Sequence, residues 1–152
     1  MADSMFEAEM AVLDRPGPGM DWADWLVARS RAVRRAMLSH RDGGRLREHM
    51  HDPSGQWPGL ELLLQMMEEA GFTVEDAMSA IFAVGHHILG SVIAQQEDQV
   101  PPGAGNAGID ARRFPRVARA VALRAEGRDH DREFEYGLAM LVAGCRAMLD
   151  RR

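Results

Sequence analysis

The stretch VEDAMSAIFAVGHHILGSVIAQQE, residues 74–97, decides the fold. Glu75 and Asp76 stand in its first turn, where acidic side chains complement the free N–H groups of a helix start, so one long helix is predicted. Its apolar residues fall three or four apart on one face, which further apolar positions widen: Met78, Ile81, Phe82, Gly85, Leu89, Val92 and Ile93, then Val74, Ala77, Val84 and Ile88. This width predicts burial on two sides, by the chain's own domain and by a second copy.

The composition limits the class of protein. The chain has 152 residues and one cysteine, Cys145, which allows no internal disulfide and is expected to be a buried, inert thiol. This length fits a single domain over residues 1–152. Neither a charged-then-apolar leader nor an uninterrupted apolar run of about 18 residues occurs. We therefore expect a cytoplasmic protein with no membrane partner.

Every basic side chain other than histidine is an arginine. The absence of lysine excludes Schiff-base chemistry and the lysine-dependent phosphate loop. The net charge is -5, and arginines and acids are mixed along the chain. Binding to a nucleic-acid backbone draws on a basic face, so we expect no direct nucleic-acid partner.

Helices are also predicted on both sides of the central stretch. Asp21 is a credible N-cap for one of them, and Gly71 is a natural C′ residue for another. No alternating period of two occurs, so the fold is predicted to be all-α. The expected helices run from Trp22 to about Ser39, from Trp57 or Pro58 to Ala70, from Ile109 or Asp110 to about Glu126, and from Arg132 to about Asp150, with a short amphipathic segment over 3–13 and a helical turn from Arg45 to about Met50.

Three local patterns resemble one known family. LSHRDGGRL (38–46), GFTVEDAMSAIFAVGHHILGSVIAQQEDQ (71–99) and FEYGLAMLVAG (134–144) are similar, in order and spacing, to the C-terminal effector-binding domain of the tetracycline repressor (TetR) family. The resemblance implies a helical domain of about six or seven helices. It also implies a homodimer whose four-helix bundle is formed by the helices starting at 74 and 132. The helix-turn-helix that precedes this domain in the family is expected to be missing.

The metal site of the tetracycline repressor itself does not carry over. The position of its metal-binding histidine is Arg47, and the carboxylate positions are Ala94 and Gln95. Magnesium needs oxygen ligands, which arginine cannot supply. We therefore expect no metal and no cofactor, and tetracycline is not transferred as the ligand.

The resemblance also implies which residues line a ligand pocket. Arg29, Arg47 and His86 are its polar anchors, and the other positions are apolar. Such a wall suits a hydrophobic or aromatic, natural-product-like ligand that carries an anionic or hydrogen-bonding group. The implied lining is Arg29, Val33, Arg47, Leu60, Leu63, Leu64, Met67, Met78, Ile81, Phe82, Gly85 and His86, with Val117 and Val121 contributed by the partner subunit.

Some of these residues have a second interpretation. Arg29 on the solvent side of its helix would pair with Asp24 or Glu48 and bind nothing. Adjacent His86 and His87 point about 100° apart on a helix, so they cannot easily both face one metal ion. Which of four histidines face the pocket is left open: His49, His51, His86 and His87.

Three functional hypotheses follow. The first is a homodimer that binds a small molecule and senses it, sequesters it, or modulates a full-length TetR-family relative. The second is a cofactor-free cyclase, isomerase or dehydratase of secondary metabolism that uses the same pocket, with His86 as general base and Arg29 as anion anchor. The third is that the chain is a fragment of a complete repressor.

Overall fold

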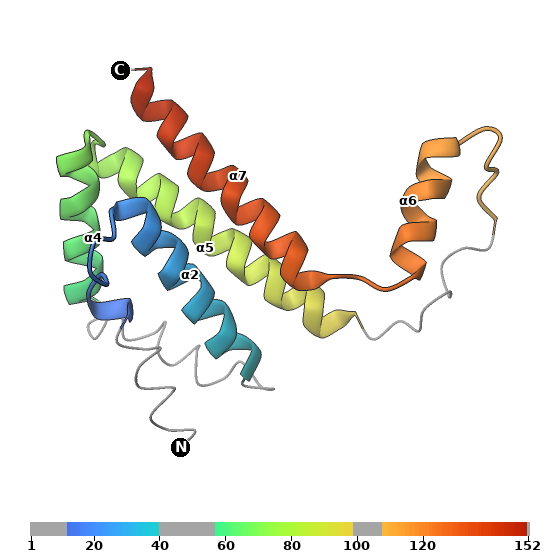
Figure 1. The fold of residues 1–152 in the computed structure, drawn as a ribbon, viewed down its shortest axis with the longest axis horizontal. Helices are drawn as coiled ribbons and strands as arrows, with labels where there is room; N and C mark the ends of the chain where they lie inside the picture. The colour runs from blue at the N-terminus through green and yellow to red at the C-terminus, as the bar shows by residue number, and fades with distance from the viewer. Residues whose placement is uncertain (1–11, 40–56, 99–107, 152) are drawn as a thin grey trace.

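The computed structural model describes residues 12–39, 57–98 and 108–151, and all regular secondary structure within these ranges is helical (Figure 1). This confirms the predicted all-α fold class. The amphipathic segment before Val12 and the predicted turn over 45–50 lie outside the described residues. The helices with defined bounds are α2 (Trp22–Ser39), α4 (Trp57–Ala70), α5 (Val74–Glu97), α6 (Pro115–Ala125) and α7 (His130–Asp150).

Helix α5 lies at the centre of the domain, and it contacts α2, α4 and α7 (Figure 1). Its start is capped by Thr73, whose Oγ1 accepts a hydrogen bond from the Asp76 N–H at 3.1 Å. The core forms where these helices meet, and its largest fully buried members include Trp25, Leu63, Met67, Phe134 and Leu138. The predicted length and bounds of this central helix are confirmed.

The helix ends flanking α5 follow the predicted chemistry. The Asp21 carboxylate accepts a hydrogen bond from the Asp24 N–H at 2.8 Å, so Asp21 caps α2. Gly71 has φ 113° after α4, and the Phe72 N–H then donates to the Met67 carbonyl at 3.0 Å. Only glycine adopts this left-handed conformation readily, and the turn aims Phe72 into the core.

Two predicted boundaries differ from the structure. Helix α6 begins at Pro115 and not at 109 or 110, because the Asp110 carboxylate accepts the N–H groups of Arg112 and Arg113 at 3.0 and 3.3 Å and holds a turn there. Helix α7 begins at His130, two residues before the prediction, because Asp129 caps it through the Arg132 N–H at 2.9 Å. Both shifts come from aspartate side chains that bond to nearby backbone.

Helix α6 stands apart from the other four helices, at the far end of the molecule (Figure 1). None of its residues is buried. Its apolar side chains Val117 and Leu123 are 51% and 67% exposed. Phe114, just before the helix, is exposed as well. The helix therefore obtains little packing energy from its own subunit.

Helix α5 meets the length and composition criteria for a membrane-spanning helix, and only 22% of its most apolar window is buried inside the domain. Its contacts with α2, α4 and α7 place it in the core of a helical domain. The apolar residues that those neighbours leave uncovered are the feature to be explained. They include Phe82, Leu89 and Ile93.

Candidate functional site

The predicted ligand-binding residues on α2 and α4 lie where these two helices meet. Leu63 and Met67 belong to the buried core, while Val33 and Leu64 are partly buried and pack against it. Gly59 is buried, and a Cβ at this position would lie 2.1 Å from the Leu13 carbonyl oxygen. A residue with a side chain would push the start of α4 away from the segment before α2.

Arg29 occupies this junction. Its guanidinium carbon lies 5.2 Å from the centre of the Trp25 ring, and its Nη1 lies against Gly59. Nη1 is buried and has no hydrogen-bond partner in the described part of the chain. Burial lowers the pKa of the Arg29 guanidinium below its usual value, and the charge of Asp14 offsets this only in part. Arg29 is therefore a desolvated cation, and the hydrogen-bonding capacity of its Nη1 is not used.

The predicted lining residues on α5 divide into two groups. Met78 and Ile81 are half-buried, whereas Phe82, Gly85 and His86 are exposed on the uncovered side of the helix. Leu60 on α4 is half-buried. Val117 is exposed on α6 and Val121 is half-buried there, while Arg47 lies outside the described residues. The structure thus gathers Arg29 with the α2 and α4 residues and leaves the α6 residues far from them, and the pocket as a whole stays a prediction.

The two adjacent histidines have different environments. The His87 ring stacks on Phe134 with the ring centres 5.3 Å apart, and its Nε2 lies 2.9 Å from the Phe134 carbonyl oxygen. A Cβ on Gly137 would lie 2.3 Å from the His87 ring, so glycine at this position lets α5 and α7 approach. His87 therefore joins α5 to α7, and His86 is exposed. The catalytic alternative built on His86 and Arg29 stays a prediction.

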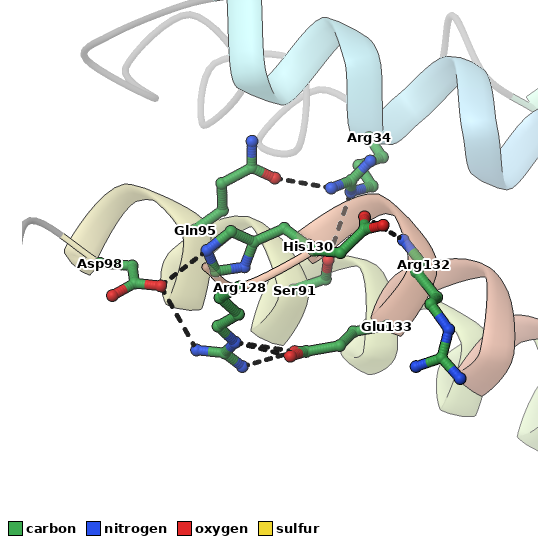
Figure 2. A network of polar contacts seen from close by, with 9 residues as sticks. Arg34, Ser91, Gln95, Asp98, Arg128, His130, Arg132 and Glu133 are labelled. Atoms are coloured by element: carbon green, nitrogen blue, oxygen red, sulfur yellow. Dashed lines mark hydrogen bonds and ion pairs between the residues drawn. The ribbon is translucent and has the colours of Figure 1, made fainter. Parts of the chain in front are cut away.

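A polar network joins the end of α5 to the start of α7 (Figure 2). Arg34 donates to three side chains: Ser91 Oγ at 3.2 Å, Asp131 Oδ1 at 2.7 Å and Gln95 Oε1 at 2.6 Å. Its guanidinium also lies 4.7 Å from the centre of the Phe134 ring. The Arg34 side chain is 8% exposed, so this buried cation is fully engaged by the fold.

A second group of the same network ties the loop after α6 to the end of α5 (Figure 2). His130 Nε2 lies 2.8 Å from Asp98 Oδ2, and Arg128 pairs with Glu133 at 2.7 Å. An open depression of about 410 Å³ lies here, lined by Gln95 and by residues 127–131. Its charged groups pair with one another, so we interpret it as a structural joint.

Arg34 was not identified from the sequence. The signal was present, because Trp22, Leu26, Ser30 and Arg34 follow one another at four-residue intervals and all are buried. A polar residue on a buried stripe of a helix requires partners inside the protein. Its position in an apolar four-residue repeat is therefore enough to make such a residue a candidate for a network or a binding site.

The remaining chemistry is limited. Cys145 is buried, as predicted, and burial raises the pKa of its thiol. Within residues 12–39, 57–98 and 108–151 no group of three or more His, Cys, Asp or Glu side chains could hold a metal. Gln95 stands at one of the positions where the family resemblance would place a metal-binding carboxylate. Its side-chain oxygen accepts a hydrogen bond from Arg34.

Residues 15–149 match the family described as tetracyclin repressor-like, C-terminal domain. The tetracycline repressor protein class A from transposon 1721 of Escherichia coli is 26% identical over 147 residues, which cover 95% of this chain and 68% of that protein. The class D tetracycline repressor protein of Escherichia coli is 31% identical over 134 residues, 88% of this chain and 61% of that protein. The chain thus spans between 61% and 68% of the length of these relatives.

Solved structures give the same result. A possible TetR family transcriptional regulator from Streptomyces coelicolor A3(2) superimposes with a TM-score of 0.70 at 28% identity, covering 97% of this chain and 75% of that one. TetR from Acinetobacter baumannii AYE superimposes with a TM-score of 0.65 at 26% identity, covering 96% of this chain and 72% of that one. The similarity in sequence and the similarity in fold extend over nearly the whole chain.

Proposed function

Because the chain belongs to the tetracycline repressor (TetR) family, as a tetracyclin repressor-like C-terminal domain, we propose that it is a cytoplasmic homodimer that binds a small molecule. It acts as a sensor, as a sequestering protein, or as a modulator that pairs with a full-length regulator of the same family. The single observation that carries this proposal is the apolar surface that α5 and α7 leave uncovered.

That surface follows one face of each helix. On α5 the exposed side chains Phe82, Leu89 and Ile93 share a face, with Phe82 59% exposed. On α7 Tyr136 and Met140 are exposed, and Ala143 and Ala147 continue their face at helical spacing. Large exposed apolar areas on a soluble domain mark interaction sites, and small residues on α7 allow close approach of another helix. Two copies of α5 and two of α7 supply a four-helix bundle.

Helix α6 supports the same proposal. It is an amphipathic helix with no buried residue, and it extends away from its own subunit (Figure 1). A helix this short is marginal in water unless an apolar face is covered. We propose that it packs on the second copy, where Val117 and Val121 then close the ligand site of that copy.

The ligand site lies at the junction of α2, α4 and α5. Three apolar side chains are only partly buried there, so their surface is available to a ligand: Val33, Leu64 and Ile81. The ligand is not a magnesium chelate of the tetracycline type, because Ala94 and Gln95 stand at the carboxylate positions and the Gln95 oxygen is bonded to Arg34. A hydrophobic or aromatic organic molecule fits this lining.

Size-exclusion chromatography with multi-angle light scattering at micromolar concentration tests the proposal. The expected mass is twice the 16.9 kDa of one chain. Met140→Arg places a charge in the proposed interface and is expected to give monomers, because burying an unpaired charge is unfavourable. Ala70→Arg is the matched control at an exposed position at the end of α4, and it is expected to stay dimeric. A parent protein that elutes with the mass of one chain would contradict the proposal.

A further inference from the structure

The strongest unexplained feature of the molecule is the buried, unpartnered Nη1 of Arg29. Buried side-chain nitrogens are nearly always hydrogen-bonded, and leaving a charged group without a partner costs several kcal/mol. The Leu13 carbonyl oxygen and Arg29 Nη1 both lie close to Gly59. No hydrogen bond joins this oxygen to Nη1. The described chain therefore brings a cation into its interior without supplying an acceptor for this nitrogen.

Neighbouring carboxylates do not fully balance the positive charge of Arg29. Two carboxylates that reach α2 serve other arginines of this helix, Glu135 with Arg31 and Asp131 with Arg34. Asp14 acts on Arg29 through its charge alone, and the pKa of the guanidinium still falls below its usual value. The described carboxylates therefore balance the charge of Arg29 only in part.

The start of α4 also favours an anion. Nη1 lies against Gly59, in the first turn of α4, and this turn contains no acidic side chain. The first N–H groups of a helix have no acceptor within the helix, and the helix dipole makes this end positive. The guanidinium therefore lies beside the first turn of α4, and each of these two groups attracts an anion.

The apolar neighbours determine what kind of anion fits. The Trp25 ring lies under the guanidinium, and Leu63 and Leu64 follow on α4. These side chains offer no hydrogen bonds to a small inorganic ion, but they cover the body of an organic molecule. Resting on the proposed ligand-binding function, we propose that the ligand is a hydrophobic organic anion, whose carboxylate or sulfonate binds the Arg29 guanidinium beside the first turn of α4.

A matched pair of fluorescent probes tests this assignment with the full chain. The probes are 8-anilinonaphthalene-1-sulfonate, which is an aromatic anion, and N-phenyl-1-naphthylamine, which is the same ring system without the sulfonate. The parent protein is expected to bind the sulfonate more tightly by at least about tenfold, which corresponds to about 1.4 kcal/mol. Arg29→Met is expected to remove this preference by weakening the binding of the sulfonate much more than that of the neutral probe.

Two further variants make the test specific. Arg29→Lys keeps a positive charge but loses the planar donor set, so part of the preference is expected to persist. Arg31→Met removes an exposed arginine of the same helix that pairs with Glu135, and it is expected to leave both affinities unchanged. Circular dichroism of each variant confirms that the helices are intact, and Arg29→Lys takes the place of Arg29→Met if the latter does not fold.

The outcomes separate the two proposals. If both probes bind and Arg29 substitutions change neither affinity, the site exists but the anion assignment is wrong. If the neutral probe binds more tightly than the sulfonate, the anion assignment is wrong as well. If neither probe binds to the parent protein, the proposed small-molecule site fails, and the assignment fails with it.

Discussion

Helix α2 carries a buried guanidinium group, that of Arg34, and a half-buried one, that of Arg29, and their environments are opposite. Arg34 donates to Ser91, Gln95 and Asp131, and Phe134 covers it from one side. Arg29 rests on an aromatic ring too, but its buried Nη1 has no acceptor in the described part of the chain. Two arginines of one helix therefore differ: the guanidinium of Arg34 has hydrogen-bond acceptors for its donors, whereas the buried Nη1 of Arg29 has none in the described part of the chain.

We interpret this difference as one between an end of the domain that stabilises the fold and an end that accepts the proposed ligand. Burying a charge is unfavourable unless hydrogen bonds and an opposite charge replace the lost water. The Arg34 end meets this requirement internally, with Asp131 at 2.7 Å, and so it joins α2, α5 and α7. The Arg29 end does not, which is the pattern expected where a bound molecule supplies the missing group.

Removing Arg34 is expected to have the largest effect. Arg34→Met keeps most of the side-chain volume but leaves Ser91 and Gln95 without their buried donor, so the free energy of unfolding should fall by roughly 2–4 kcal/mol. Urea denaturation followed by circular dichroism measures this. Arg31→Met, which removes an exposed arginine of the same helix, is the control and should lose far less. Equal losses in the two variants would show that the Arg34 network does not hold the helices together.

Although Arg29 Nη1 lacks an acceptor in the described part of the chain, the start of α4 packs tightly against the segment before α2 at Gly59. In Gly59→Ala the new Cβ would lie 2.1 Å from the Leu13 carbonyl oxygen and 2.8 Å from Arg29 Nη1. We expect a loss of about 1–3 kcal/mol in the free energy of unfolding. Gly144→Ala on α7, where a Cβ meets nothing within 4 Å, should stay within about 1 kcal/mol of the parent. A harmless Gly59→Ala would mean that the unpartnered Nη1 reflects loose packing.

The exposed ion pairs should have the smallest effect, and it depends on pH. Hydrogen bonds from Arg31 hold the pKa of Glu135 below its usual value. The stability that this gives is complete above the usual glutamate pKa and is lost as the pH falls through the lowered value. The pair is about half exposed, so solvent screens it. Glu135→Gln should be slightly less stable than the parent at about pH 7, and this gap should narrow as the pH falls below the usual glutamate pKa. A stability gap that widens toward acid would contradict the assignment.

The fold could be predicted from the sequence because its signals are local. The apolar spacing of residues 74–97, the cap at Asp21 and the turn at Gly71 each depend on neighbouring residues, and each is confirmed. The start of α6 was misplaced because the Asp110 side chain bonds to its own loop, a contact that competes with helix formation. An aspartate just before a predicted helix therefore has two interpretations, as a cap and as a turn.

The site was less predictable because its features arise from residues far apart in sequence. The partners of Arg34 come from α5 and α7, which hydrophobic periodicity does not reveal. The prediction that Arg29 binds a ligand rests on the family resemblance alone, because nothing in the sequence pattern distinguishes Arg29 from the exposed Arg31. Burial of one nitrogen, and the lack of an acceptor for it, become visible only when α2, α4 and the segment before α2 are assembled.

The claim that one arginine of α2 serves the fold and the other serves a ligand is tested most directly by the stability of Arg29→Met without ligand. Replacing a desolvated cation that lacks an acceptor by an apolar side chain of similar length should leave the free energy of unfolding within about 1 kcal/mol of the parent, or raise it. Urea denaturation of the purified, ligand-free protein gives that number. A loss as large as that of Arg34→Met would show that Arg29 is part of the fold, and it would contradict the account.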